Sequence, residues 1–361
     1  MNGETPRIGY VPYSNTLERP GDRRRFVAYA HARNLPFELA HPEERYDLVV
    51  LSEVADISIW CDYPHGKVVY DLIDSYLTIP RTNVKQWLRG AVWYALGRHR
   101  RLRLDHWAAI QDMCRRADAV VCTTKEQRED IQRYCPNVHI VLDVHSSVVH
   151  DAKENYSCGE TFNLVWEGLP SNITQLKQIR EVLRDINKHR PLVLNIVTDP
   201  DQPRLLGRFG RVQSLDLARE VFDSVRLHPW DEATCSEFIR NCDLAVIPID
   251  LSDPFVTGKP ENKLLLLWRI GMPVVVSATP AYQRAMRDVG LESLACRDQR
   301  EWLTALERVI GDESMRREAG TRGRDFAETH FSKGLMLARW DAVFASLGFN
   351  FGAGIISSCV A

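Results

Sequence analysis

The sequence predicts an α/β protein with two parallel-sheet domains in tandem. Short β-branched runs bounded by turn residues alternate with longer amphipathic stretches, and this alternation occurs twice, before and after a polar segment. Strands and helices in repeated alternation indicate a parallel sheet, because parallel neighbours require a crossover connection. The length of 361 residues supports the same division, since a domain commonly holds roughly 100 to 200 residues.

The first half of the sequence alternates strand-like runs with helical patterns. The strand-like runs are residues 7–11, 48–52, 68–73, 119–122 and 140–144, and apolar residues recur with helical spacing in residues 23–34, 84–96 and 125–134. We therefore expect a first domain that spans residues 1–157.

The second half repeats this arrangement after a polar stretch at residues 145–159. Its strand-like runs are residues 163–166, 192–197, 225–227, 244–249 and 273–277, and the pattern is helical from residue 301 to about residue 347. We expect a second domain at residues 158–330 and a closing segment at residues 331–361. The apolar side of residues 333–347, which includes Trp340, must be buried either on the first domain or within the second.

Composition argues against several classes of protein. The 46 Lys and Arg residues nearly balance 48 Asp and Glu residues, so we expect no general attraction to nucleic acid. The nine cysteines are scattered without a Cys-x-x-Cys pair or metal-ligand spacing. We therefore expect reduced thiols, a cytoplasmic location and no metal site. The apolar runs are far shorter than the roughly 20 residues of a membrane-spanning helix.

The segment from residue 244 to residue 278 is the most informative one. A strand-like run ends at Pro248, and a loop with Lys259 and Lys263 then opens a helix. The start of a helix beside two ammonium groups suits a diphosphate without a metal, although the same lysines would also fit an ordinary solvated loop. The Gly-x-Gly-x-x-Gly pattern is missing after the first strand, which argues against a dinucleotide-dependent dehydrogenase.

The order of motifs in the second half resembles a known family. The Asn-Lys pair at residues 262–263, followed by Gly-Met-Pro-Val-Val from Gly271, resembles the donor-site segment of GT-B glycosyltransferases, particularly those similar to glycosyltransferase family four. VWEGLPSN, with Trp166 and Gly168, resembles the first strand and turn of their C-terminal domain. HPWDEATCSEFIRNCDLAVIP resembles their segment beside the nucleotide base. The sequence from LERVIGDESMRREAGTRGRDFAETHFS to ARWDAVFASL resembles their closing helices.

The resemblance implies a fold, a reaction and a set of site residues. The fold is two Rossmann-like domains that face each other across a cleft, with a closing helix that returns to the N-terminal domain. The reaction is metal-independent transfer of a hexose, without a cofactor, from a nucleotide-diphosphate sugar to a glycan or lipid-linked acceptor in bacterial polysaccharide biosynthesis. The implied donor-binding residues are Gly168, Trp230, Lys259, Asn262 and Lys263. Lys263 is also implied to be catalytic, because it would stabilise the departing diphosphate.

One departure from the family pattern leaves alternatives open. Many members carry two glutamates eight positions apart, where this sequence has Thr257 and Leu265. A leucine cannot accept a hydrogen bond from a sugar or ribose hydroxyl, so the recognition of the ribose and the anomeric outcome stay open. A non-hydrolysing sugar-nucleotide epimerase shares the architecture, and a catalytically silent subunit that only binds a partner is a further alternative.

The N-terminal half offers fewer candidates. Asp74 follows a strand-like run that includes Asp71, and we expect it to accept the proton of the acceptor, although an aspartate there can also cap a helix. One arginine of residues 23–25 is expected to point inward. The arginines of residues 98–103, near Trp93 and Trp107, suit a peripheral contact with an anionic membrane at its inner face, or simply a solvated basic helix end.

Overall fold

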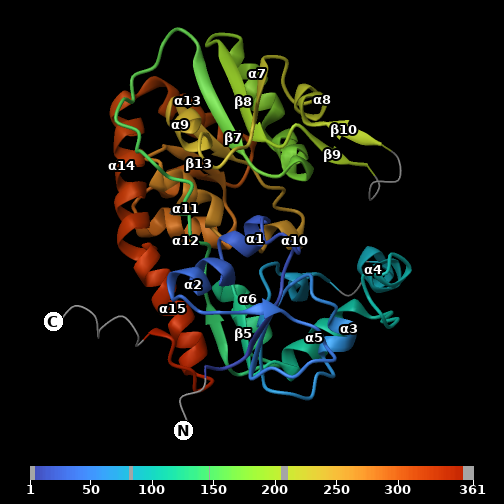
Figure 1. Ribbon diagram of the computed structural model, residues 1–361. Helices are drawn as coiled ribbons and strands as arrows, with labels where there is room; N and C mark the ends of the chain where they lie inside the picture. The colour runs from blue at the N-terminus through green and yellow to red at the C-terminus, as the bar shows by residue number, and fades with distance from the viewer. Residues whose placement is uncertain (1–4, 81–83, 146, 205–209, 353–361) are drawn as a thin grey trace, which may run out of the picture. The chain divides into compact units, whose positions relative to one another are not determined.

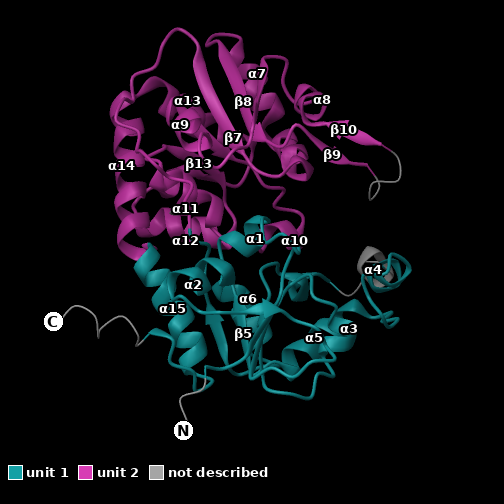
Figure 2. Cartoon of the chain, viewed as in Figure 1, with its two compact units in different colours: residues 1–144, 333–361 teal, residues 145–332 magenta. Residues whose placement is uncertain are grey.

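Each half of the chain forms its own parallel sheet. The computed structural model describes residues 5–80, 84–145, 147–204 and 210–352, with backbone only for residues 84–88. It divides into two units, which we call unit 1 (residues 1–144 and 333–361) and unit 2 (residues 145–332) (Figure 2).

The sheet of unit 1 has six parallel strands in the order β2-β1-β3-β4-β5-β6. The strands are β1 (Ile8–Val11), β2 (Glu38–Leu39), β3 (Leu48–Ser52), β4 (Lys67–Asp71), β5 (Ala119–Cys122) and β6 (Val138–Ile140). The sheet grows in one direction from β1 to β2 and in the other from β3 onward. The carboxyl ends of β1 and β3 therefore flank a switch point, the usual position of a ligand in such sheets.

Helices connect these strands, and one further helix comes from the end of the chain. They are α1 (Pro20–Arg23), α2 (Phe26–Ala32), α3 (Ile57–Trp60), the 3-10 helix η1 (Tyr76–Thr78), α4 (Val84–Ala95), α5 (His106–Arg116), α6 (Lys125–Ile131) and α15 (Lys333–Ala345). Figure 1 shows α15, in red, beside α2, in blue. Trp340 and Phe344 of α15 are fully buried in the core of unit 1. Their rings lie 6.0 Å and 5.2 Å from that of Tyr29. The expected return of the closing helix to the N-terminal half is confirmed.

The main sheet of unit 2 also has six parallel strands, in the order β11-β8-β7-β12-β13-β14. They are β7 (Phe162–Glu167), β8 (Leu192–Thr198), β11 (Val225–Pro229), β12 (Leu244–Ile247), β13 (Val274–Ser277) and β14 (Ala295–Cys296). The strands β9 (Asp201–Pro203) and β10 (Arg211–Gln213) form a separate antiparallel pair. The switch point of the main sheet lies between β7 and β12.

The helices of unit 2 follow its strands in the alternation that the sequence predicts. They are the 3-10 helices η2 (Pro170–Ile179) and η4 (Glu292–Leu294), and α7 (Arg180–Asn187), α8 (Ser214–Arg219), α9 (Cys235–Arg240), α10 (Pro254–Thr257), α11 (Asn262–Arg269), α12 (Pro280–Asp288), α13 (Gln299–Gly311) and α14 (Glu313–His330). The expected α/β class with two Rossmann-like halves is thus observed. Within the described residues, no helix has both the length and the apolar character of a membrane span.

The polar stretch around residue 150 belongs to unit 2, whereas the sequence placed the domain boundary after residue 157. Lys153 Nζ donates hydrogen bonds to the carbonyls of Arg240 and Cys242, at 2.9 Å and 2.7 Å. The hydroxyl of Tyr156 donates to the carbonyl of Gly271 at 2.8 Å. These side chains satisfy backbone carbonyls of unit 2, which moves the division to residues 144 and 145.

Candidate functional site

The switch point of unit 2 brings together most of the residues that the motif implied. Strand β7 ends at Glu167, and Gly168 follows directly. The connection after β12 passes through α10 and reaches α11, whose first residues are Asn262 and Lys263. The N-cap residue Glu261 makes no side-chain capping hydrogen bond to α11, and the start of a helix is a position that favours anions.

Lys263 packs tightly against the turn after β7. Its ammonium lies over the ring of Trp166, 4.7 Å from the ring centroid. A Cβ at Gly168 would lie 2.6 Å from Lys263 Nζ and 3.0 Å from the Trp166 ring. A side chain at position 168 would therefore displace the ammonium, which explains why glycine suits this position.

The ammonium of Lys263 lacks a compensating contact with an acid. Among the described residues, it forms no hydrogen bond or ion pair in addition to its contact with Trp166. Burial lowers the pKa of Lys263 to about 8; the charge of Glu167 opposes this shift and that of Lys259 reinforces it. A bound anion would relieve the cost of burying this charge, and the site therefore favours anionic ligands.

Lys259 lies in the loop before α11 and connects it to the segment after β7. Its Nζ donates a hydrogen bond to Asn172 Oδ1 at 3.4 Å, and its side chain is partly buried. The structure therefore places Lys259, Asn262, Lys263 and Gly168 at one edge of the sheet. Trp230 lies two strands away, after β11, where its backbone N–H donates to the carbonyl of Thr198 at 3.0 Å.

The structure also shows which residues occupy the positions of the missing glutamates. Leu265 is buried in α11, with 1% of its surface exposed, and the hydroxyl of Thr257 donates to the carbonyl of Asp253. Neither offers a carboxylate. A carboxylate is present instead at Glu167, a buried residue with 9% exposure that precedes Gly168 and that no motif singles out in the sequence. The available signal was an acidic residue at the end of a strand otherwise rich in apolar residues.

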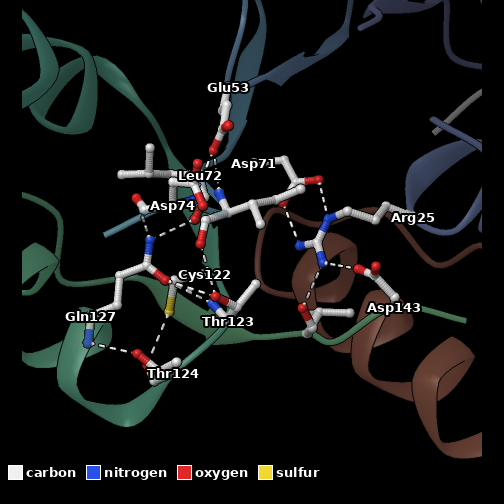
Figure 3. Close-up of polar contacts among 12 residues, drawn as sticks. Arg25, Glu53, Asp71, Leu72, Asp74, Cys122, Thr123, Thr124, Gln127 and Asp143 are labelled. Carbon is white, nitrogen blue, oxygen red and sulfur yellow. Dashed lines mark hydrogen bonds and ion pairs between the residues drawn. The ribbon is translucent and has the colours of Figure 1, made fainter. Parts of the chain in front are cut away.

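Unit 1 contains a second polar cluster, around Asp74, which Figure 3 shows. Glu53 follows β3, and its Oε2 accepts hydrogen bonds from the backbone N–H groups of Ile73 and Asp74, at 3.1 Å and 2.8 Å. Gln127 Nε2 donates to the carbonyl of Asp74 at 3.1 Å. The residue at the N-cap of η1 is Ser75, so Asp74 does not occupy the capping position that was its alternative role.

Glu53 has the protonation behaviour of a candidate acid or base. Burial, together with the neighbouring charges of Asp74 and Asp71, raises the pKa of Glu53 to about 8, against the lowering effect of the two backbone hydrogen bonds. A carboxyl group that titrates near neutral pH can exchange protons with a substrate. No motif marks Glu53 in the sequence, because its partners lie about 20 residues further along the chain.

The inward-pointing arginine of unit 1 is Arg25, and its partners are internal. Its Nε and Nη2 bind the two carboxylate oxygens of Asp71 at 2.7 Å and 2.5 Å, and Nη1 donates to Val141 O and to Asp143 Oδ1 at 3.0 Å and 3.1 Å (Figure 3). Arg25 is fully buried. It therefore holds together the ends of β4 and the chain after β6 instead of presenting itself to a phosphate.

The basic segment near α4 is largely neutralised. Arg100, Arg101 and Arg103 form ion pairs with Glu43, Asp62 and Asp112, at 2.7 Å, 2.5 Å and 3.6 Å. Trp107 is buried, and its Nε1 donates to the carbonyl of Ile79 at 3.0 Å, so its indole is not at the surface. Beside the exposed Arg100 and Arg101, the segment also exposes large hydrophobic side chains, those of Val92, Tyr94, Leu102 and Leu104. The predicted attraction to anionic lipid is therefore weaker than the arginines suggest.

Among the described residues, no group of three or more His, Cys, Asp or Glu side chains has an arrangement that could hold a metal ion.

Comparison with known proteins supports the fold. No sequence-family profile matches the chain, and no curated protein matches its sequence significantly. The structure of TarM aligns with a TM-score of 0.56 and 10% identity, over 82% of this chain and 54% of TarM, so the chain spans about half the length of that protein. A glycosyltransferase from Rickettsia africae ESF-5 aligns with a TM-score of 0.57 and 9% identity, over 95% of this chain and 98% of its own. These likenesses support a GT-B-like fold.

Proposed function

We propose that the protein is a glycosyltransferase that moves a sugar, expected to be a hexose, from a nucleotide-diphosphate sugar to a glycan or lipid-linked acceptor. The observation that carries the proposal is the ammonium of Lys263, which forms no ion pair, at the switch point of unit 2 next to Gly168 and Lys259. An anion site at this position of such a sheet suits the diphosphate of a nucleotide. The fold shared with a glycosyltransferase favours the same reaction class.

In this proposal Lys263, Lys259 and the first turn of α11 hold the diphosphate. The bond between the sugar C1 and the diphosphate oxygen breaks, a bond forms between C1 and an acceptor oxygen, and the nucleoside diphosphate leaves with the bonding electrons. Donors fixed in position before the reaction stabilise this developing charge without reorganisation. The phosphate would also raise the pKa of Lys263 and keep it protonated.

The acceptor must lose a proton during this transfer. We assign that proton to the carboxylates of unit 1, with Asp74 as the residue that the sequence singled out and Glu53 as its neighbour. A carboxyl group with a pKa near 8 suits proton transfer close to neutral pH. In this assignment unit 1 takes the acceptor and unit 2 takes the donor.

Release of nucleoside diphosphate with transfer of the sugar tests the proposal. The full chain is incubated with UDP-, GDP- and other nucleotide sugars and with glycan and lipid-linked acceptors, and both products are followed by mass spectrometry. We expect both products to form, with and without EDTA. Interconversion of the donor without an acceptor would instead indicate an epimerase. Binding without turnover across the panel would indicate a silent subunit.

The cellular setting that we propose follows from the implied acceptors. A nucleotide sugar as donor suits the cytoplasm of a bacterium, in the biosynthesis of a polysaccharide. The exposed Leu102 and Leu104 would let the protein touch the inner face of the membrane, where a lipid-linked acceptor lies.

A further inference from the structure

A buried carboxylate lies next to the proposed diphosphate site and has no evident structural role. Glu167 ends β7 and is 9% exposed. Among the described residues, its side chain forms no hydrogen bond or ion pair. Buried charged groups are normally paired, because an unpaired one loses its hydration without compensation. A ligand that binds the carboxylate would supply the missing contacts.

Glu167 lies close enough to Lys263 to influence the charge of its ammonium. Its negative charge raises the pKa of Lys263, against the effect of burial, and raises that of Tyr282. Yet Glu167 and Lys263 form no ion pair with each other. The ammonium can only donate hydrogen bonds and the carboxylate can only accept them. A complementary ligand therefore carries an anionic oxygen for Lys263 and a hydroxyl group for Glu167.

This requirement distinguishes among anionic ligands. A bare phosphate or pyrophosphate would gain from Lys263 and Lys259, but the charge of Glu167 would repel it. A phosphate joined to a polyol avoids this conflict, because a hydroxyl of the ribose or of the sugar can donate to the carboxylate. Leu265 and Thr257 offer no acid for that purpose.

We propose that Glu167 determines specificity in the donor site, where its carboxylate accepts hydrogen bonds from a hydroxyl of the nucleotide sugar whose diphosphate Lys263 holds. The inference rests on the proposed function and assigns to Glu167 the hydroxyl recognition that the residues at positions 257 and 265 cannot provide. The hydroxyl belongs either to the ribose or to the transferred sugar.

Calorimetric titration of the full chain separates these sources. Wild type, Glu167→Ala and Glu167→Gln are each titrated with pyrophosphate, a nucleoside diphosphate and the matching nucleotide sugar. The control is Glu220→Gln, which changes an exposed acid of unit 2 that pairs with Lys177. We expect Glu167→Ala to weaken binding of the nucleotide sugar by roughly 10- to 100-fold, as befits a hydrogen bond to a charged group. Glu167→Gln keeps one acceptor oxygen and the volume of the side chain, so its affinity for the nucleotide sugar should fall less than that of Glu167→Ala.

Pyrophosphate should bind Glu167→Ala as well as or better than wild type, because a repelling charge is removed. Equal weakening for the nucleoside diphosphate and the nucleotide sugar would assign the hydroxyl to the ribose, and weakening confined to the nucleotide sugar would assign it to the sugar. If the Ala and Gln variants bind the nucleotide sugar as tightly as wild type does, the role of Glu167 is refuted while the proposed function stands. If wild type binds no nucleotide, both proposals are refuted.

Discussion

Replacement of Lys263 by methionine should make unit 2 more stable and the donor site weaker. Methionine keeps the unbranched shape but removes the charge. In the folded protein the pKa of Lys263 falls from its ordinary value of 10.5 to about 8, which corresponds to roughly 3 kcal/mol of lost stability when the group is charged in both states. Loss of the contact with Trp166 offsets about 0.5 to 2 kcal/mol of the gain. We therefore expect Lys263→Met to raise the free energy of unfolding by roughly 1 to 3 kcal/mol at pH 7.

The stability difference between Lys263→Met and wild type should decrease as the pH rises. The unfolded chain keeps the Lys263 proton up to its ordinary pKa of 10.5, whereas the folded chain releases it near 8. Wild type therefore gains stability as the pH rises through this window, and its difference from the variant should shrink. Thermal unfolding at pH 7 and pH 10 measures the effect, with about 2 to 4 °C expected for each kcal/mol.

The binding assay completes this test. Calorimetry with a nucleoside diphosphate should show Lys263→Met weaker by roughly 10- to 100-fold, the range for a hydrogen bond to a charged group. Lys177→Met, an exposed lysine of unit 2 paired with Glu220, serves as the control and should leave binding unchanged. Equal binding by Lys263→Met and wild type, or a variant less stable than wild type at pH 7, would refute the interpretation of Lys263 as a functional charge.

Four further predictions concern unit 1. Transfer should accelerate as the pH rises through about 8, when Glu53 loses its proton, and Glu53→Gln should be slow without this dependence; persistence of the dependence in the variant would point to another base. Burial favours the protonated form of Glu53, whose pKa is 4.5 in the unfolded chain and about 8 in the folded one. The free energy of unfolding of wild type should therefore fall as the pH rises between these two values, and that of Glu53→Gln should fall less. Trp340→Ala should lower the unfolding free energy of unit 1 by about 3 to 5 kcal/mol, measured in urea, while donor binding persists; lost donor binding in the folded variant would contradict this. Wild type should pellet with anionic vesicles at low salt, and the double change Leu102→Asp with Leu104→Asp should abolish pelleting; wild-type protein that stays in the supernatant would show that the segment is only a solvated face.

The central strands could be predicted from the sequence because most of their residues are apolar. Strands β3, β12 and β13 are covered on both faces, so they read as continuous runs of branched residues. The edge strands β2 and β14 have two residues each and carry no such signal. The domain boundary was misplaced because Lys153 and Tyr156 look like linker residues until their carbonyl partners in unit 2 are known.

The residues of the candidate site also fall into those that the sequence could predict and those that only the structure reveals. Lys259 and Lys263 lie in one continuous motif, so the sequence alone could place them together. Glu53 and Glu167 gain their interest only from burial and from charges on other segments. The ion pairs of the arginines near α4 could not be predicted for the same reason, because their acidic partners are distant in sequence: Glu43 is 57 residues from Arg100.

A crystal structure of the protein with a bound nucleotide-diphosphate sugar tests the account most directly. We predict that the diphosphate lies against Lys263 Nζ and Gly168, that Lys259 contacts it, and that Glu167 accepts a hydrogen bond from a hydroxyl of the same ligand. A nucleotide sugar bound at another place, with Lys263 left on the ring of Trp166 and no anion beside it, would contradict the assignment of the donor site.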